Sequence, residues 1–457
     1  MRYRSQSVAY WFFAVAMLLF ALQLVFGFLS VAKYLGPDPL LNVLPFDVTK
    51  VIHTNLLVVW VLMGFLGAAY YIVPQECETE LHSTRMAVWT LLLLAVLGVV
   101  AIVGYMFGWT AGNKLLEQPL PIKLGIVVVM LMFAYNILQT MRKAPRVTGT
   151  AVVLVAGLLG AALLFLPALL DFRNYTVATF YRWWTIHLWV EGVFELIQAS
   201  MLAFLLMHLT GVSRTTMEKW LYIVVGLTFL TGLIGTAHHY FWIGVPEYWL
   251  PLGGFFSALE PLPFLAMALM AYYALRQMKV APPNRVALHW AMGSALMAGI
   301  GAGLLGLAHT WPAVNRWTHG TMVTPMHGHL AFFGAYGMII LGMISYTTPF
   351  LTGNPEKAHR HGGIGLWAFW LMVAGITGMT MAFGAAGIGQ VYMERILGMG
   401  YLDVQLLLHV HFQMLVFAAV VFASGVMLFL WDFFMRHPRQ GIALGEPAVP
   451  HEEPAEV

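Results

Sequence analysis

Long apolar segments follow one another along the whole chain, and short polar loops separate them. A helix needs about 20 mostly apolar residues to cross the hydrocarbon core of a bilayer. About twelve segments have this length, whereas a membrane β-strand would be about 10 residues long and would alternate in polarity. The pattern therefore predicts an all-α membrane protein with about twelve transmembrane helices. The predicted spans are residues 8–32, 51–73, 87–109, 124–141, 151–170, 183–209, 220–242, 252–275, 287–309, 322–347, 364–383 and 404–429.

The composition excludes a soluble protein. Hydrophobic residues occupy 60% and charged residues only 9% of the 457 positions, whereas a soluble domain carries about 25% charged residues. The net charge of +3 is spread over the loops, so we expect a lipid bilayer as the surroundings and no nucleic-acid partner. Residues 1–435 are expected to form one polytopic membrane domain, whose first span is retained as an anchor. The polar, Pro-rich tail 436–457 is expected to be disordered.

Lysine and arginine predict the orientation, because cytoplasmic loops carry an excess of these residues. If the N-terminus is cytoplasmic, 15 of the 23 Lys and Arg residues fall on the cytoplasmic side and 8 on the other side. Both termini are therefore predicted to be cytoplasmic. The odd-numbered spans then run outward, and the even-numbered spans run inward.

Histidine is abundant for so apolar a chain, with 17 residues. Six histidines from four predicted spans fall at one depth, within about 10 Å of the outer surface for a helical rise of about 1.5 Å per residue. Ionisable groups inside membranes are rare and usually functional. A shared functional site is therefore favoured over six separate structural roles. The six residues are His53, His187, His238, His239, His327 and His329.

The spacing of these histidines indicates more than one metal. The rings of His327 and His329 point about 200° apart on a helix, so they can bind two metals on opposite helix faces. Gly328 between them would let a flat macrocycle approach the backbone. His238 and His239 point about 100° apart and can converge on one metal.

Three carboxylates also lie within predicted spans. Glu191 is one helical turn after His187 and on the same face, and a carboxylate beside imidazoles is typical of a non-haem iron site. Glu195 and Glu260 are the other two, and each is expected to be a ligand, a proton carrier or a protonated spectator. Away from the helix ends, the inner halves of the spans contain no Lys, Asp or Glu. Protons are therefore expected to reach the site from the outer side.

His409 and His411 repeat the H-x-H spacing near the outer end of the twelfth span. For this second pair a structural role is favoured over metal binding.

The single cysteine is Cys77, so the chain has no disulfide framework and no CxxCH motif for covalent haem. A covalently attached haem would therefore lie on another chain.

Five segments combine these residues in one order and cover most of the chain. They are His53-Thr-Asn-Leu-Leu57, His187-Leu-Trp-Val-Glu-Gly-Val-Phe-Glu195, Gly235-Thr-Ala-His-His-Tyr-Phe-Trp-Ile-Gly244, Ser257-Ala-Leu-Glu-Pro-Leu-Pro-Phe264 and His327-Gly-His-Leu-Ala-Phe-Phe-Gly334. Together with the number and length of the spans, they resemble the haem–copper oxidase superfamily. Within it, the closer resemblance is to the large catalytic subunits of cytochrome c-dependent nitric oxide reductases. The resemblance implies a bundle like that of the haem–copper oxidase catalytic subunit.

The resemblance also implies two b-type haems and a non-haem iron. His53 and His329 would be the axial ligands of a low-spin haem b. His327 would be the proximal ligand of a high-spin haem b that faces the non-haem iron. The ligands of this iron would be His187, His238, His239 and Glu191.

The resemblance further implies a role for each carboxylate and a partner subunit. A calcium ion bridges haem propionates in this family, and Glu117 would be its protein ligand. Glu191 would tune the iron, and Glu195 and Glu260 would balance charge or relay protons. The implied reaction reduces two NO molecules to nitrous oxide and water with two electrons and two protons. A membrane-anchored cytochrome c subunit is the implied donor, because quinol-fed relatives carry a long extension before the first span, which here begins near residue 8.

The implied location is the bacterial inner membrane, with the active site near the periplasmic side. A terminal oxygen reductase of the same superfamily stays open as the main alternative. Many oxidases have a tyrosine at the position of Glu191 and others have one in the next span, but residues 223–237 contain none. Copper also disfavours a carboxylate ligand, whereas iron accepts one.

Two alternatives come from other classes. A secondary transporter would place its polar residues in interrupted spans near the midplane, and the purified protein would be colourless. A dihaem electron carrier would leave Glu191 and the His238–His239 pair without a role. Metal and haem analysis of the purified protein separates all of these functions.

Overall fold

The computed structural model of the protein describes residues 1–38, 40–358 and 362–436. Within these residues, twelve helical segments are long and apolar enough to cross a membrane. The predicted all-α membrane fold is thus confirmed. Of the predicted tail 436–457, all but Arg436 lies outside the described residues, so the end of the membrane domain at 435 and the disorder of the tail stay predictions.

Four of the described spans are single α-helices, and eight are composites joined through a tighter or wider turn. The single helices are α2 (Phe46–Glu76), α3 (Thr84–Met106), α4 (Leu120–Lys143) and α18 (His409–Phe434). The composites are η1 (Arg4–Ser7) with α1 (Val8–Ala32), α5 (Gly149–Leu164) with η2 (Leu166–Leu169), α6 (Tyr175–Leu188) with η3 (Trp189–Val193) and α7 (Phe194–Thr210), α8 (Arg214–Gly235) with η4 (Thr236–Tyr240), α9 (Trp249–Leu259) with α10 (Pro261–Gln277), α11 (Arg285–Ala298) with η5 (Gly299–Leu304) and α12 (Leu305–Thr310), α14 (Val323–Phe332) with η6 (Phe333–Gly337) and α15 (Met338–Leu351), and α16 (Ile364–Gln390) with η8 (Val391–Ile396). The short helices outside the spans are α13 (Pro312–Thr318), η7 (Pro355–Ala358) and α17 (Tyr401–Leu407).

Apolar residues surround most of these helices, and the backbone hydrogen bonds within each helix satisfy the polar groups that a bilayer cannot. Several helices begin at a side chain that accepts a hydrogen bond from the first turn. These N-cap residues are Ser83, Thr148, Asn174, Ser213 and Asn284. At the other end of the sixth span, Gly211 takes φ +74°, a conformation that favours glycine and ends α7.

Two predicted span ends differ from the structure by more residues than any other predicted end. The sixth span begins at Tyr175 rather than 183, because Asn174 caps a first turn whose polar residues hid its helical character. His187 therefore lies about three turns from the helix start, deeper within its helix than predicted. The eleventh span continues through η8 to Ile396 instead of ending at 383.

Glycines explain the long eleventh span. The sequence from 384 onward is rich in glycine, which is usually a sign of a helix end. Here Gly384 and Gly387 instead let α16 lie close against α14. A Cβ at Gly387 would be 2.4 Å from the backbone nitrogen of Val323, and a Cβ at Gly384 would be 2.8 Å from the sulfur of Met326.

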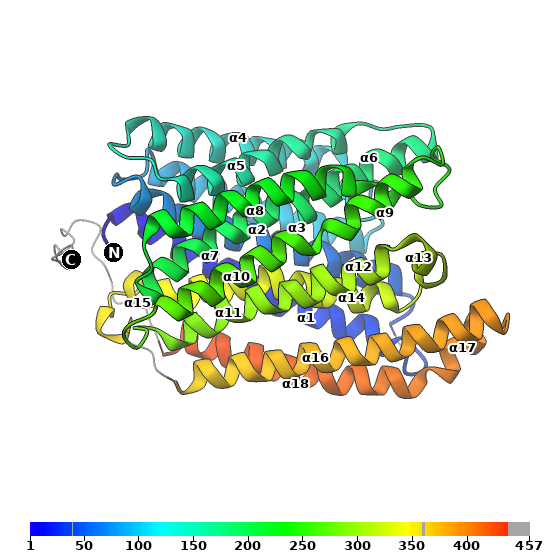
Figure 1. Ribbon diagram of the computed structural model, residues 1–457. Helices are drawn as coiled ribbons and strands as arrows, with labels where there is room; N and C mark the ends of the chain where they lie inside the picture. Colours follow the sequence, from blue (N-terminus) through cyan, green and yellow to red (C-terminus); the bar gives the residue numbers. More distant parts are fainter. Residues whose placement is uncertain (39, 359–361, 437–457) are drawn as a thin grey trace.

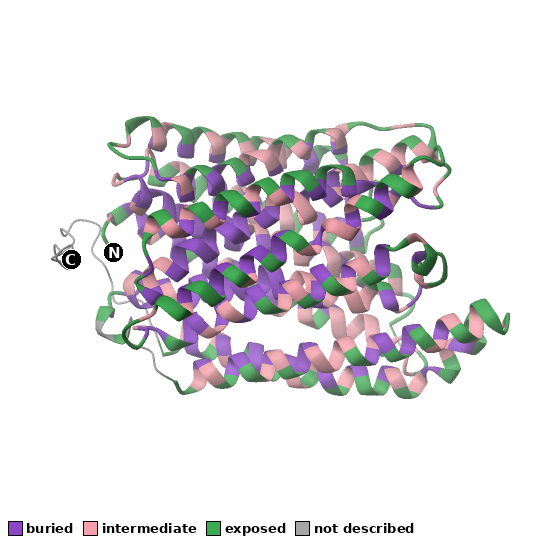
Figure 2. Cartoon of the chain, in the orientation of Figure 1, coloured by how far each residue is buried: buried purple, intermediate pink, exposed green. Residues whose placement is uncertain are grey.

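The helices lie side by side in one bundle, and α16 and α18 form a hairpin along one side of it (Figure 1). Burial is concentrated in the middle of the bundle (Figure 2). In the most apolar 18-residue stretch of each described span, the share of buried residues is highest in Val323–Leu351 at 83%, Phe46–Glu76 at 78% and Tyr175–Thr210 at 67%. These three central spans carry four of the six histidines at the shared depth, which places them inside the protein rather than against lipid.

A buried ion pair ties three helices together at the end of the bundle where the N-terminus lies. The Glu76 carboxylate ends α2 and is 2% exposed. It accepts hydrogen bonds from Thr148 Oγ1 at 2.6 Å, from Arg214 Nη2 at 3.0 Å and from Arg214 Nη1. The pair thus connects α2 to the starts of α5 and α8. At the same end, Glu80 accepts hydrogen bonds from the backbone of Arg4 and Ser5.

Replacing Arg214 with Met is expected to lower thermal stability. The Glu76 carboxylate would stay buried without its charged partner, which costs about 3 kcal/mol in a buried pair, and somewhat less here because the Arg214 side chain is 32% exposed. Thermal unfolding of the purified complex in detergent measures the change. The matched control is Lys219→Met on the exposed face of the same helix. Equal unfolding temperatures for the two variants would contradict a stabilising role for the pair.

Candidate functional site

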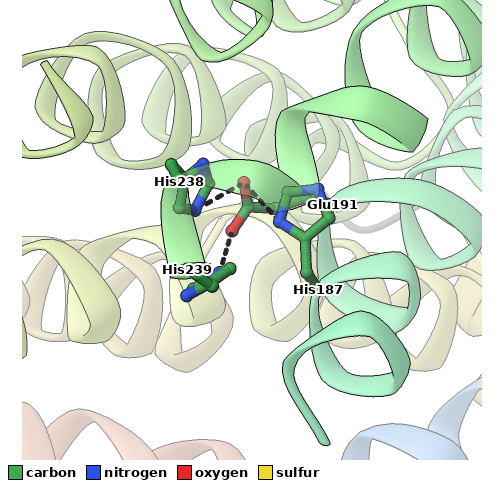
Figure 3. Close-up of side chains that lie close together, drawn as sticks. All are labelled: His187, Glu191, His238 and His239. Atoms are coloured by element: carbon green, nitrogen blue, oxygen red, sulfur yellow. Dashed lines mark ion pairs between the residues drawn. The ribbon is translucent and has the colours of Figure 1, made fainter. Parts of the chain in front are cut away.

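Four side chains from two neighbouring spans converge at one point in the buried interior. They are His187, Glu191, His238 and His239, and one ligand atom of each lies within 4.8 Å of all the others. Glu191 lies between the three rings, which face it from two sides (Figure 3). Its carboxylate oxygens are 3.4 Å from His187 Nδ1, 3.8 Å from His238 Nε2 and 3.7 Å from His239 Nε2. Three imidazole nitrogens and one carboxylate oxygen form a donor set that suits iron.

Glu191 reaches this point because the helix changes its winding there. The residue lies in the π-turn η3, with φ −115° and ψ 26° instead of helical values. A π-turn adds one residue to the helical ladder and is frequent at functional sites. The spacing of His187 and Glu191 predicts one shared face of a regular helix, so the convergence of the two residues was predicted but the turn that produces it was not.

His187 is held in one orientation by a neighbouring helix. Its Nε2–H donates a hydrogen bond to the carbonyl of Gly232 at 2.7 Å. The other ring nitrogen, Nδ1, therefore carries the lone pair, and it is buried without a hydrogen-bond partner among the described residues. Gly232 is required for this approach, since a Cβ there would be 2.2 Å from the carbonyl oxygen of Glu191.

His238 and His239 lie in the tight 3₁₀ turn η4 that ends the seventh span. His238 Nδ1–H donates to Ser257 Oγ at 2.8 Å, and the Ser257 hydroxyl in turn donates to the carbonyl of Gly235 at 3.3 Å. This leaves His238 Nε2 as the free acceptor facing Glu191. The ring of His239 stacks on Trp183, with centroids 4.3 Å apart and planes 6° apart, and its buried Nε2 has no hydrogen-bond partner among the described residues.

His53 and His329, from the second and the tenth span, lie opposite each other in the bundle. Their ring centroids are 6.2 Å apart and their planes differ by 27°. A metal about 2 Å from one nitrogen of each ring separates the ring centres by roughly 6 Å. His53 Nδ1–H donates to the carbonyl of Gln23 at 2.9 Å, and His329 Nδ1–H donates to the carbonyl of Pro325 at 2.8 Å. Both Nε2 atoms are therefore available to one metal between them.

His327 points to the other side of the same helix. Its Nδ1–H donates to the carbonyl of Gly301 at 2.9 Å, so its Nε2 is also available as a ligand. His309 lies 6.1 Å from it, centroid to centroid. Both nitrogens of His309 are occupied, with Thr318 at 3.0 Å and Thr324 at 3.2 Å, so His309 is a poor candidate ligand. The two members of the H-x-H pair thus face different parts of the interior.

The two remaining carboxylates of the interior adjoin the cluster. Glu260 Oε1 is 3.6 Å from His238 Nδ1 and has no hydrogen-bond partner among the described residues. Glu195 accepts a hydrogen bond from Thr228 Oγ1 at 2.9 Å. Gly235 makes room for Glu260, since a Cβ at this glycine would be 2.2 Å from Glu260 Oε1. Both carboxylates are almost fully buried, at 2% exposure for Glu195 and 5% for Glu260.

Glu117 lies in the loop before α4 and is held beside α2. Its carboxylate accepts hydrogen bonds from Asn55 Nδ2 at 3.0 Å and from the Leu115 backbone at 2.7 Å. Asn55 is two residues after His53, so Glu117 lies close to the helix that carries a predicted haem ligand. Nearby, burial lowers the pKa of Lys114 below its ordinary value, with Lys50 and Arg182 acting in the same direction and Glu117 acting against them.

Several residues that shape the site were not predicted. Trp183 could have been found, because it lies one turn before His187 and therefore on the same helix face. Gly232 and Ser257 gave no local signal, since their partners are 45 and 19 residues away. Tyr336 likewise contacts the site from a distant span.

Replacing Ser257 with Ala is expected to weaken metal binding about 10–100-fold, the usual effect of losing a partner that orients a ligating histidine. The His238 ring would lose the acceptor that fixes its tautomer. Metal content per haem after dialysis against a chelator measures the effect. Ser424→Ala, which removes an exposed hydroxyl from α18, is the control. Unchanged metal retention in Ser257→Ala would show that this hydrogen bond does not orient a ligand.

The chain matches the family described as "Cytochrome C and Quinol oxidase polypeptide I" over residues 7–423. It is 42% identical, over 467 aligned residues, to a subunit of the nitric oxide reductase of Stutzerimonas stutzeri, with 98% of each chain covered. A heme-copper terminal oxidase dimer solved by cryo-EM superposes with a TM-score of 0.73 at 14% identity, covering 97% of this chain and 85% of that one, a likeness of fold alone. The predicted resemblance is thus confirmed. The chain belongs to the cytochrome c and quinol oxidase polypeptide I family of haem–copper oxidases, and it is an oxidoreductase with haems and a metal centre.

Proposed function

We propose that this chain is the catalytic subunit of a nitric oxide reductase, which reduces two NO molecules to nitrous oxide and water. The observation that carries the proposal is the position of Glu191 among three histidines. A carboxylate in the donor set favours iron over copper, and so favours NO reduction over the alternative, oxygen reduction. The 42% identity to the nitric oxide reductase of Stutzerimonas stutzeri supports the same function.

The residues fit three metal groups. His53 and His329 would hold a low-spin haem b between them, because the gap between their rings matches two axial ligands. His327, on the opposite helix face, would hold a high-spin haem b. The non-haem iron would be held by His187, His238, His239 and Glu191. When bound, the irons would pass the donor's electrons to NO and supply the open coordination positions that NO reduction requires.

The side chains around the centre position ligands and hold protons. Gly232 and Ser257 fix the orientations of two histidine ligands, so the donor atoms are in place before the metal binds. The charge of Glu191 would partly offset that of the iron. Glu195 and Glu260 would hold protons for the water that is formed. Glu260 Oε1 suits this role, since it is buried beside the cluster and has no hydrogen-bond partner among the described residues.

Glu117 would be the protein ligand of a calcium ion. Calcium binds carboxylate and carbonyl oxygens. The Glu117 carboxylate is buried beside the helix of His53 and is held by Asn55 and the Leu115 backbone, so it is oriented before any ion binds.

Electrons would come from a membrane-anchored cytochrome c subunit, because this chain has no motif for covalent haem. The protein would lie in the bacterial inner membrane with both termini in the cytoplasm, as the Lys and Arg distribution favours. The end of the bundle with Glu76 and the N-terminus would then be cytoplasmic, and the active site would lie nearer the periplasm.

Replacing Glu191 with Gln is expected to lower NO reduction at least 100-fold while both haems are retained. Loss of a partner of a ligand costs about 10–100-fold, and loss of the ligand itself costs at least as much. NO consumption at an electrode and haem content measure the two effects. Glu247→Gln in an exposed loop is the control. Wild-type turnover with full iron content in Glu191→Gln would contradict the ligand assignment.

The H-x-H pair gives a second prediction, because its two rings serve different metals. His329→Ala should remove the low-spin haem and leave the non-haem iron in place. His327→Ala should retain the low-spin haem and lose NO binding at the high-spin haem. Optical spectra of the reduced proteins with and without NO distinguish the two variants. Loss of the same single haem from both would show that the two histidines share one metal.

Protons are expected to come from the outer side, because Glu260 lies in the outer half of its span, Glu191 and Glu195 lie near the middle of theirs, and the inner halves of the predicted spans lack Lys, Asp and Glu. Turnover of the oriented complex in sealed vesicles, with an outer-face electron donor, should consume outer protons and build no membrane potential. Moving one charge across the membrane is worth about 2.3 kcal/mol per 100 mV, so an inner route would be detected. Uncoupler-sensitive alkalinisation of the inner compartment would contradict the outer route.

A further inference from the structure

A tyrosine of the haem-ligand span contacts the backbone beside Glu191. Tyr336 lies in the π-turn η6, in the same span as His327 and His329, and it is 3% exposed. Its hydroxyl donates a hydrogen bond to the carbonyl of Val190. Val190 is the residue before Glu191 in the π-turn η3. A direct hydrogen bond therefore joins the span of the predicted haem ligands to the turn that presents the carboxylate.

The π-turn around Glu191 is also contacted by α8, the helix that contains Gly232. The carbonyl of Glu191 lies so close to Gly232 that a Cβ there would be 2.2 Å away. The carbonyl of the same Gly232 accepts the hydrogen bond of His187. The backbone on either side of the Glu191 side chain is therefore fixed, at Val190 by a tyrosine hydroxyl and at Glu191 itself by contact with a glycine.

The ring of Tyr336 has little freedom to move. It packs edge-on against Phe194, with centroids 5.5 Å apart, and against Phe65 at 6.0 Å. Phe194 is the first residue of α7, directly after the π-turn. Replacement of Tyr336 by Phe would keep this packing and remove the hydroxyl alone, so the contribution of the hydrogen bond can be measured separately from that of the ring.

We propose that Tyr336 is a positioning residue that sets the place of the Glu191 carboxylate in the metal centre through its hydrogen bond to the Val190 carbonyl. The inference rests on the proposed function, because it needs Glu191 to be a metal ligand. Loss of a residue that holds a metal ligand in position costs about 10–100-fold in metal affinity or activity. The hydrogen bond also couples the position of the helix that carries His327 to that of Glu191.

The test compares Tyr336→Phe with Tyr346→Phe in the complete enzyme with its partner subunit. Tyr346 lies in the same span, and its hydroxyl makes no hydrogen bond within the described residues. Tyr336→Phe is expected to keep both haems, to bind the non-haem iron about 10–100-fold more weakly in a chelator titration, and to change the Mössbauer parameters of the non-haem iron. Tyr346→Phe should match the wild type in all three measurements.

A second variant tests the same backbone from the other side. Gly232→Ala should push the Glu191 carbonyl away and give the same loss of iron with both haems retained. If this variant does not assemble, the Tyr336→Phe measurements stand alone. Wild-type iron retention and unchanged Mössbauer parameters in Tyr336→Phe would overturn the inference.

The Glu191→Gln variant separates the two proposals. If Glu191→Gln loses iron and activity while Tyr336→Phe behaves as Tyr346→Phe does, the inference fails and the proposed function stands. If Glu191→Gln keeps both, the ligand assignment itself fails. In the double variant, Tyr336→Phe should add nothing to Glu191→Gln, because it acts through that residue. A further loss of the same size would show that Tyr336 acts elsewhere and would overturn its role as a positioning residue for Glu191.

Discussion

A buried neutral imidazole needs a hydrogen-bond acceptor for its N–H group, because an unpaired N–H inside a membrane protein costs free energy. Five of the six central histidines meet this need in one way, by donating one N–H to an oxygen of the surrounding backbone or side chains. The second nitrogen is then a lone-pair donor directed into the interior. The arrangement of helices around these acceptors thus decides which nitrogen of each ring is free to bind a metal.

Two of the five acceptors belong to glycines at irregular or closely packed stretches of helix. The carbonyl that orients His327 belongs to Gly301 in the π-turn η5, and the carbonyl that orients His187 belongs to Gly232 beside the π-turn η3. A regular helix uses almost all its carbonyls in its own ladder. The irregular turn at Gly301 and the close helix contact at Gly232 therefore help to provide acceptors in the interior of the bundle.

The sequence was sufficient for the fold and for the four residues that converge at Glu191. The lengths of the apolar segments predicted twelve spans, since a bilayer sets a minimum length for each, and the rarity of ionisable groups marked the histidines and Glu191. It was insufficient for the backbone irregularities. The π-turn at Glu191 depends on Tyr336 and Gly232, whose partners are 146 and 45 residues away. The end of the eleventh span at Ile396 was not predicted for the same reason. The glycines that pack against α14 look locally like a helix end.

The π-turn at Glu191 has a consequence for the comparison of related chains. One extra residue in a helix rotates everything beyond it by about 100° relative to everything before it. The part of this span before the turn, with His187, and the part after it, with Glu195, therefore present faces that no uninterrupted helix could present together. A relative that lacks one residue here would align well on both sides of the gap, yet its carboxylate at this position would leave the centre unless the whole helix after the turn rotated with it.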